Sequence, residues 1–299
     1  MHSTQRQFSQ MAKAARWAWL AAMMVCVTSG AYCWIAHSIE QAAMQSVAVA
    51  LTRSDADPEA KAIALARFVH ANGGTRRNPG WFGIPSWRAT PLQVATTGGD
   101  CADKSRLLVA LLSGIGLRAT PVLCFDSVTG TPAHTMVEVE PVQGRHMVLD
   151  PAYNLWFPKP GGGYHDIDEL RANPSIVPAR VVEIQNHLPS ARPRHEYYLR
   201  SRADYHTAST FHWNRGPLTK ALFTIFQAVL GDSVFRLPRP IWLEDPILKG
   251  FLTAFLCALL LGAMPVLLRT VARRARTVSA AQELDSCPSV DSHSSPALV

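Results

Sequence analysis

Side chains that together could carry out nucleophilic catalysis follow one another in the middle of the chain. They are a cysteine after a glycine turn, a histidine that opens an alternating stretch, and an aspartate before a proline, at Cys101, His134 and Asp150. A thiol nucleophile, an imidazole that serves as its base and a carboxylate that orients the imidazole make up a cysteine-dependent catalytic set. Their order therefore predicts an enzyme.

Cys101 lies where the sequence predicts the first turn of a helix. Asp100 is a suitable N-cap, Asp103 is a favourable acid in the first turn, and Gly114 and Gly116 mark the end of the helix. The positive end of a helix dipole favours the thiolate form of a cysteine, which is its reactive form. Backbone N–H groups at the same helix end could stabilise the oxyanion that forms when a carbonyl is attacked.

The elements after this helix must bring the other two side chains to it. Strands are predicted over residues 117–125, 134–142 and 146–149, with turn-forming residues between them. The second strand alternates in a way that is typical of burial on one face only. A helix followed by an antiparallel meander indicates an α+β fold. Such a meander can place the start of one strand, with His134, beside the end of its neighbour, with Asp150.

Other segments predict the surroundings of this core. Residues 58–72 predict a helix that begins with a proline and stops at a glycine pair, and residues 166–172 predict a short helix. Residues 76–97, with their glycines, prolines and scattered tryptophans, predict an ordered loop.

Each of the three candidate side chains also has an ordinary structural interpretation. A cysteine at a helix start is often a small buried residue, a lone histidine is often a satisfied polar group, and aspartate before proline is common in turns. The combination and the placement of Cys101, His134 and Asp150 favour the functional interpretation.

Short motifs around these residues resemble the core of the transglutaminase-like superfamily. They are GDCADKSRLL at 99–108, GLRA at 116–119, HTMVEV at 134–139 and LDP at 149–151. The resemblance covers about residues 55–185 and implies a papain-like core, in which the cysteine-bearing helix packs on an antiparallel sheet. It also implies a Cys101–His134–Asp150 triad and acyl-enzyme chemistry on amides, ending in hydrolysis or in transfer to an amine. Many bacterial members are thought to be peptidases or amidases. Met136 departs from the family pattern, which usually has an aromatic residue there, and this leaves the substrate open.

Further polar residues have weaker cases for a functional role. Gln93 could donate to an oxyanion, although a solvated loop glutamine is the simpler interpretation, and His146 and His165 are interpreted as structural or exposed. No cysteine pair or histidine cluster has the spacing of a metal site, including the loose group His195, His206 and His212. The proposed chemistry requires neither a metal nor a cofactor.

Two uncharged apolar stretches, Trp17–Ala36 and Gly250–Leu268, have the length of membrane-spanning helices. Basic residues precede the first and follow the second, so the positive-inside rule predicts two cytoplasmic ends and an extracytoplasmic centre in a bacterial inner membrane. A cleaved signal peptide for the first stretch and a buried core helix for the second are the alternatives. The predicted division is a cytoplasmic start (1–16), a span (17–39), a transglutaminase-like domain (40–185), a juxtamembrane extension (186–246), a span (247–268) and a basic, then disordered, cytoplasmic tail (269–299).

The formal net charge of +7 suggests anionic partners. Much of the excess lies in the membrane flanks and in a patch at Arg192, Arg194, Arg200 and Arg202, so attraction to lipid headgroups is favoured over nucleic-acid binding. The nearly uniform apolar segment Leu218–Leu230 is expected to lie against the bilayer. The expected partners are a peptide or protein amide substrate and membrane lipid.

Two rival hypotheses remain open from the sequence. The domain could be an inactive binding or assembly module of the cell envelope, which would be favoured if Cys101 formed a disulfide with Cys124. The protein could also be a cytosolic enzyme whose core helices resemble spans.

Overall fold

The protein is described from a computed structural model that covers residues 2–75, 77–80, 87–187, 203–240 and 244–285. The chain divides into two compact units. The first is Cys33–Lys249, and the second consists of Met1–Tyr32 together with Gly250–Val299. The domain limits drawn from the sequence stay predictions. The candidate chemistry lies in the first of these units.

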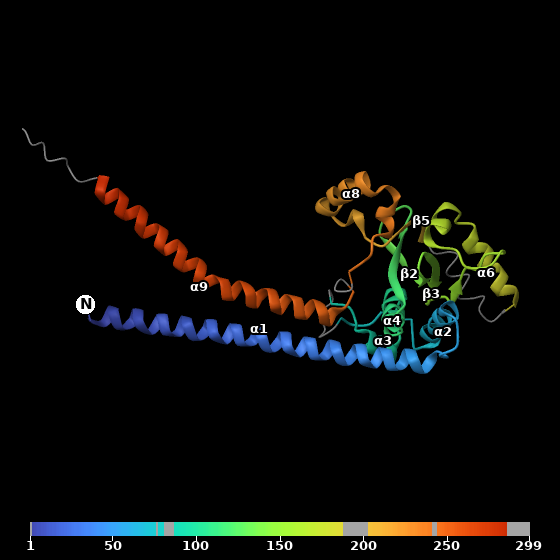
Figure 1. Ribbon diagram of the computed structural model, residues 1–299, viewed down its shortest axis with the longest axis horizontal. Coiled ribbons are helices and arrows are strands. Elements are labelled where there is room, and N and C mark those ends of the chain that lie inside the picture. The colour runs from blue at the N-terminus through green and yellow to red at the C-terminus, as the bar shows by residue number, and fades with distance from the viewer. Residues whose placement is uncertain (1, 76, 81–86, 188–202, 241–243, 286–299) are drawn as a thin grey trace, which may run out of the picture. The chain divides into compact units, whose positions relative to one another are not determined.

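A five-stranded antiparallel sheet forms the centre of the unit Cys33–Lys249 (Figure 1). Its order is β4-β3-β2-β1-β5, and neighbouring strands pair antiparallel. The strands are β1 (Arg118–Asp126), β2 (Pro132–Val142), β3 (Arg145–Asp150), β4 (Leu155–Trp156) and β5 (Ala203–Ser209). Because helices pack on this sheet, the predicted α+β class is confirmed, as is the meander of its first three strands.

Helix α4 (Cys101–Gly114) lies against one face of the sheet and begins at the residue that the sequence predicts. Its buried leucines join residues of α2 (Pro58–Ala71), β2 and β3 in a first core cluster. This cluster includes Leu107, Leu111, Val137 and Val139. The cysteine-bearing helix is therefore packed on the antiparallel sheet by apolar contacts one to three turns beyond Cys101.

The other face of the sheet is covered as well. Helices α5 (Ile167–Ala172) and α6 (Ile176–His187) contribute to a second core cluster, which contains Val122, Met136 and Leu170. The prediction that the second strand is buried on one face only is therefore wrong. The polar residue on its other face, Glu138, is 5% exposed and is held by ion pairing, which a polar-apolar alternation cannot reveal.

A short helix, α3 (Pro91–Thr97), replaces the last part of the predicted loop over residues 76–97. The Thr90 side chain accepts the N–H of Gln93, and Pro91 occupies the first helical turn, where its missing N–H costs nothing. Thr90 and Pro91 together are a helix-start signal in a segment whose other residues predict irregular structure.

An arm of helical segments follows β5 and returns to the domain. It consists of η3 (Trp213–Arg215), α8 (Pro217–Leu230) and η4 (Gly231–Arg236), and Figure 1 shows α8 projecting from the sheet. The Thr210 N–H donates to the Phe235 carbonyl over 2.9 Å, so the two ends of the arm meet. The Arg236 guanidinium pairs with Glu138 at 2.9 Å and Asp168 at 2.7 Å, which fastens the returning end to β2 and α5.

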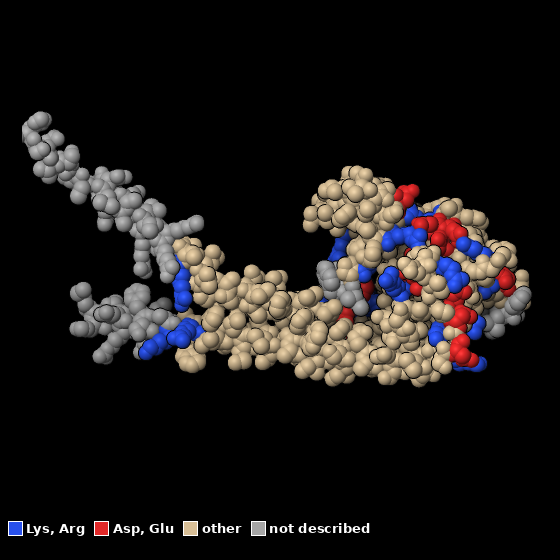
Figure 2. All heavy atoms as spheres, in the orientation of Figure 1, with Lys and Arg blue, Asp and Glu red and all other residues tan. Residues whose placement is uncertain are grey.

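Within the described residues, three helical stretches are long and apolar enough to cross a membrane: Lys13–Leu51, Pro217–Arg236 and Pro246–Val271. The first belongs to α1 (His2–Leu51) and the third to α9 (Pro246–Asp285). Figure 2 shows long surfaces of both helices without acidic or basic side chains. Membrane association is therefore plausible, and the second stretch, in the arm, adds a candidate that the sequence interpretation treated as a surface helix.

Candidate active site

Two glycines set the position of Cys101 at the start of α4. Gly98 has a φ of +74°, and a Cβ there would meet the backbone nitrogen of Gly74 at 2.3 Å. A Cβ on Gly99 would meet the Asp103 side chain at 2.3 Å, and the Gly99 N–H donates to the Gly74 carbonyl over 3.0 Å. Only glycine fits this close approach of two chain segments, so the turn fixes where the helix begins.

The buried carboxylate of Asp103 reinforces the same helix end. Asp100 Oδ1 accepts the N–H of Asp103 over 2.9 Å, and Asp103 Oδ2 in turn faces the N–H of Asp100, which makes a capping box. Asp103 Oδ2 also accepts the N–H of Asn78 over 3.1 Å, while its Oδ1 pairs with Arg106. The first turn of α4 is therefore held at several points that do not involve the Cys101 side chain.

The structure brings the other two predicted side chains into direct contact. His134 Nε2 and Asp150 Oδ2 lie 2.6 Å apart, and both side chains are buried. Asp150 Oδ1 accepts the N–H groups of Ala152 over 3.0 Å and Tyr153 over 3.2 Å, so neither carboxylate oxygen is left without a partner. The Tyr153 ring lies 5.3 Å from the imidazole, centre to centre, and limits its rotation.

His134 is strongly biased toward its charged form. Burial alone lowers its pKa, but attraction to the Asp150 carboxylate and hydrogen bonds with Asp150 and Cys101 outweigh burial and raise the pKa to about 10. Because Asp150 engages Nε2, Nδ1 is the ring nitrogen that remains for Cys101. The imidazole thus lies between the thiol and the carboxylate.

Buried polar contacts hold α4 against the elements that carry the other two groups. Ser105, one turn beyond Cys101, donates its hydroxyl to the Thr135 carbonyl over 3.0 Å, next to His134. Lys104 Nζ donates to the His70 carbonyl over 2.9 Å, and His70 Nδ1 donates to the Ala152 carbonyl over 3.1 Å, just after Asp150. These three hydrogen bonds connect α4 and α2 to β2 and to the turn that follows β3.

Cys101 and His134 line one cavity of about 890 Å³. This volume lies within the range of small-molecule and peptide-side-chain sites. Asp150 is fully buried on the far side of His134 and is not part of the lining. The cavity therefore offers room for a substrate on the thiol side of the imidazole.

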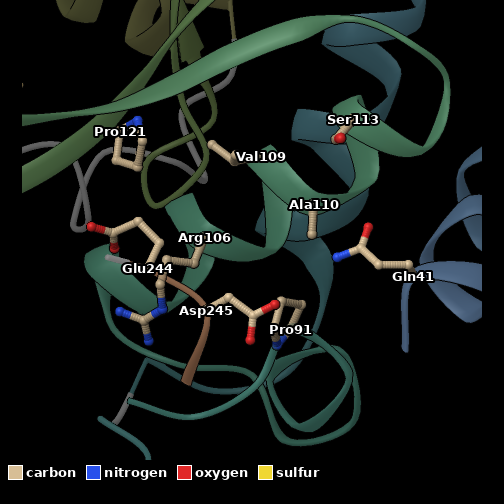
Figure 3. A pocket seen from close by; sticks show the side chains of 9 residues that line it. All are labelled: Gln41, Pro91, Arg106, Val109, Ala110, Ser113, Pro121, Glu244 and Asp245. Atoms are coloured by element: carbon tan, nitrogen blue, oxygen red, sulfur yellow. The ribbon is translucent and has the colours of Figure 1, made fainter. Parts of the chain in front are cut away.

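A second hollow of about 30 Å³ adjoins the first and is shown in Figure 3. It shares Arg106, Pro121 and Glu244 with the large cavity and extends along α4 to Ser113. A space of this size holds a few water molecules and not an organic substrate. We assign the candidate chemistry to the larger cavity.

The remaining predicted residues are dispersed. Gln93 lies in α3 and is not among the residues that line the cavity, and Met136 packs in the second core cluster. His165 lies 3.0 Å from Glu169, and His146 is half-buried on β3. Cys101 and Cys124 are not joined by a disulfide, and Cys124 is buried.

His206 and His212, the described members of the histidine group, lie in different surroundings. His206 is exposed on β5, whereas His212 lines the cavity. His195 and the patch Arg192, Arg194, Arg200 and Arg202 lie outside the described residues.

Most residues that form the walls of the cavity were not predicted from the sequence. The walls come from the segments before α3, from β1, and from η3 and the chain leading to α9, and they carry several arginines. These residues are far apart in sequence, so no spacing rule links them.

The family model described as the transglutaminase-like superfamily matches residues 45–151. The chain therefore carries a transglutaminase-like superfamily domain there, and this recognition from the motifs is confirmed. The match includes Cys101, His134 and Asp150, but it begins earlier and ends earlier than the stretch 55–185 inferred from resemblance. Neither a search of curated proteins nor a search of solved structures found a match.

Proposed function

We propose that this transglutaminase-like domain is a cysteine-dependent peptidase, amidase or acyltransferase that acts on amide bonds. The observation that carries the proposal is the buried His134 between Asp150, at 2.6 Å, and Cys101 at the cavity wall. A charged imidazole beside a thiol at a helix N-terminus favours a reactive thiolate. In this proposal Cys101 is the nucleophile, His134 the acid and base, and Asp150 the group that orients His134.

The proposed reaction has two steps. The Cys101 thiolate attacks the amide carbonyl, and His134 gives its proton to the departing amine, which leaves a thioester on Cys101. Water or another amine then attacks the thioester and loses a proton to His134, so that an acid or a new amide is released and the thiolate returns. Backbone N–H groups of Cys101 and Ala102 precede the first intrahelical bond, from Lys104 to Asp100, and are suited to stabilise the oxyanion.

The test is a comparison of the full-length protein with Cys101→Ala, on peptide and glutamine-amide substrates with water or an added amine as acceptor. We expect the substitution to lower kcat/KM by at least about 10³-fold, because residual rates without the nucleophile are small. Full activity of Cys101→Ala would contradict the proposal. Activity that appears only with an amine present would assign the protein to the acyltransferases.

We also propose that the protein is anchored in a bacterial inner membrane by two spans, in α1 and α9, with the domain outside the cytoplasm. The proposal is supported by the apolar stretches in these helices and by the basic residues Lys13, Arg16 and Arg269 beside them. Membrane lipid, which would surround the two spans, is then a partner of the protein.

In this topology α8 lies along the membrane surface and does not cross it. Its 14 residues span about 21 Å at 1.5 Å per residue, less than the roughly 30 Å of a bilayer core. Both ends of the arm are held by the domain through Thr210 and Arg236. Its exposed apolar side chains, Leu218 at 73%, Ile225 at 60% and Val229 at 76%, suit insertion into the interface.

A further inference from the structure

The large cavity around Cys101 and His134 has a strongly basic lining. Among the described residues, six cationic side chains and two acidic ones line it. The cations are Arg77, Arg88, Arg106, Arg215, Arg239 and Lys249, and the acids are Asp100 and Glu244. Of the undescribed residues that flank the lining in sequence, residue 76 is an arginine, whereas 81–86 and 241–243 contain no ionisable residue.

Part of this charge is already compensated within the protein. Arg106 pairs with the buried Asp103, and Arg239 Nε lies 2.5 Å from Glu244. The carboxylate of Asp100 is committed to capping α4. These groups form part of the cavity wall, and they leave little negative charge near the remaining arginines of the lining.

Three arginines of the lining have no such partner. Among the residues that the structure describes, no carboxylate lies within ion-pair distance of Arg77, Arg88 or Arg215. They come from separate segments, before α3 and in η3, and they open onto the same cavity as the thiol. Gathering like charges around a cavity is unfavourable unless an anion enters it.

We infer that the acyl donor is an acidic peptide segment, with carboxylates on residues that flank the amide attacked by Cys101. Guanidinium groups pair with carboxylates through two parallel hydrogen bonds, and a cluster of like charges attracts an oppositely charged ligand. Arg77, Arg88 and Arg215 are then specificity residues that hold the flanking carboxylates, while Cys101 meets the amide between them. This inference rests on the proposed function, because the amide is assigned from the candidate triad.

The test separates binding from turnover. Matched peptides that differ only by Glu, Gln or Lys at the flanking positions are titrated against full-length Cys101→Ala in nonionic detergent. We expect the Glu peptide to bind at least about tenfold more tightly than the Gln peptide, and the preference to weaken with added salt. Equal affinity for the Glu and Gln peptides would overturn the inference.

Arg77 and Arg215 are exposed, so replacing them is expected to leave the fold intact. Arg77→Gln with Arg215→Gln, in the Cys101→Ala background, is expected to reduce the Glu-over-Gln preference by about fivefold or more. The matched control is Arg118→Gln, because Arg118 is also exposed, lies outside the cavity and faces Glu140 only at 3.6 Å. A preference that survives in the double variant, or that falls equally in the control, would contradict the roles assigned to Arg77 and Arg215.

Turnover by the wild-type protein distinguishes the two proposals. Turnover of Glu and Gln peptides with equal kcat/KM would overturn the charge selectivity and leave the proposed function intact. Selective binding of the Glu peptide without any turnover would overturn the proposed function and leave the anionic selectivity of the cavity.

Discussion

His134 connects the thiol to the carboxylate, and its ionisation state governs what the site can do. A buried imidazole on its own prefers to be neutral, whereas the contact with Asp150 at 2.6 Å keeps the proton on the ring. In the proposed reaction this is the proton that His134 gives to the departing amine. Because the pKa in the folded protein, about 10, lies above the roughly 6.5 of an unfolded histidine, the pair adds stability below pH 6.5.

We expect this stabilisation to be lost as the pH rises from about 6.5 to 10. Asp150→Asn removes the carboxylate that raises the pKa of His134. Over this pH range the thermal midpoint of the variant should therefore fall less than that of the wild type. Circular dichroism melts of the full-length protein between these pH values measure it, with the exposed Asp55→Asn as control. Parallel declines in wild type and Asp150→Asn would show that the carboxylate does not hold the proton on His134.

At the scale of elements, the site depends on where α4 begins. The turn that leads into it packs Gly98 against Gly73 and Gly74 of the chain after α2, and the capping box closes the first turn. The thiol position therefore follows from contacts between the ends of α2, α3 and α4.

Gly98→Ala should be strongly destabilising. Its left-handed φ and the 2.3 Å approach to Gly74 leave no room for a methyl group, and we expect a loss of at least about 2 kcal/mol. Gly161→Ala is the control, because no atom lies within 4 Å of the added carbon there and its expected change is within about 0.5 kcal/mol. Urea midpoints followed by tryptophan fluorescence compare the two, and equal midpoints would contradict the assigned role of the turn.

The proposed orientation of α8 is tested with a photoreactive phenylalanine analogue. Placed at Ile225, on the exposed apolar face, it should cross-link lipid in reconstituted vesicles. Placed at Gln227, about 200° further around the helix, it should not, since a surface-lying helix turns that side to water. Equal lipid cross-linking from both positions would instead indicate a helix surrounded by lipid.

Local signals predicted the parts of this fold that depend on neighbouring residues. Asp100 with Asp103 marked the start of α4, and the turns between β1, β2 and β3 were recognisable. Contacts between distant residues could not be predicted in this way. The second cluster that buries Met136, the tie from Lys104 to His70 and the assembly of Arg77 with Arg215 all depend on the tertiary fold. The two-residue strand β4 was too short to carry a periodic signal.

At the scale of the whole molecule, two anchors would confine the domain to substrates near the membrane surface. The two-span topology predicts that a membrane-impermeant maleimide labels Cys101 in bacterial cells with a permeabilised outer membrane. Cys287, in the predicted cytoplasmic tail, should be labelled only after the inner membrane is opened. Labelling of Cys287 from outside, or release of the protein by alkaline carbonate, would contradict this topology.

Activation of Cys101 by His134 and Asp150 is measured most directly by the rate at which this thiol is alkylated. The full-length protein in nonionic detergent is treated with iodoacetamide near neutral pH, and modification of each cysteine is followed by mass spectrometry, with Cys287 of the polar tail, outside both proposed spans, as internal reference. We predict that Cys101 reacts well before Cys287, and that His134→Gln slows Cys101 by at least about tenfold without changing Cys287. A Cys101 that reacts no faster than Cys287, or at the same rate in His134→Gln, would contradict this activation and favour a binding module without chemistry.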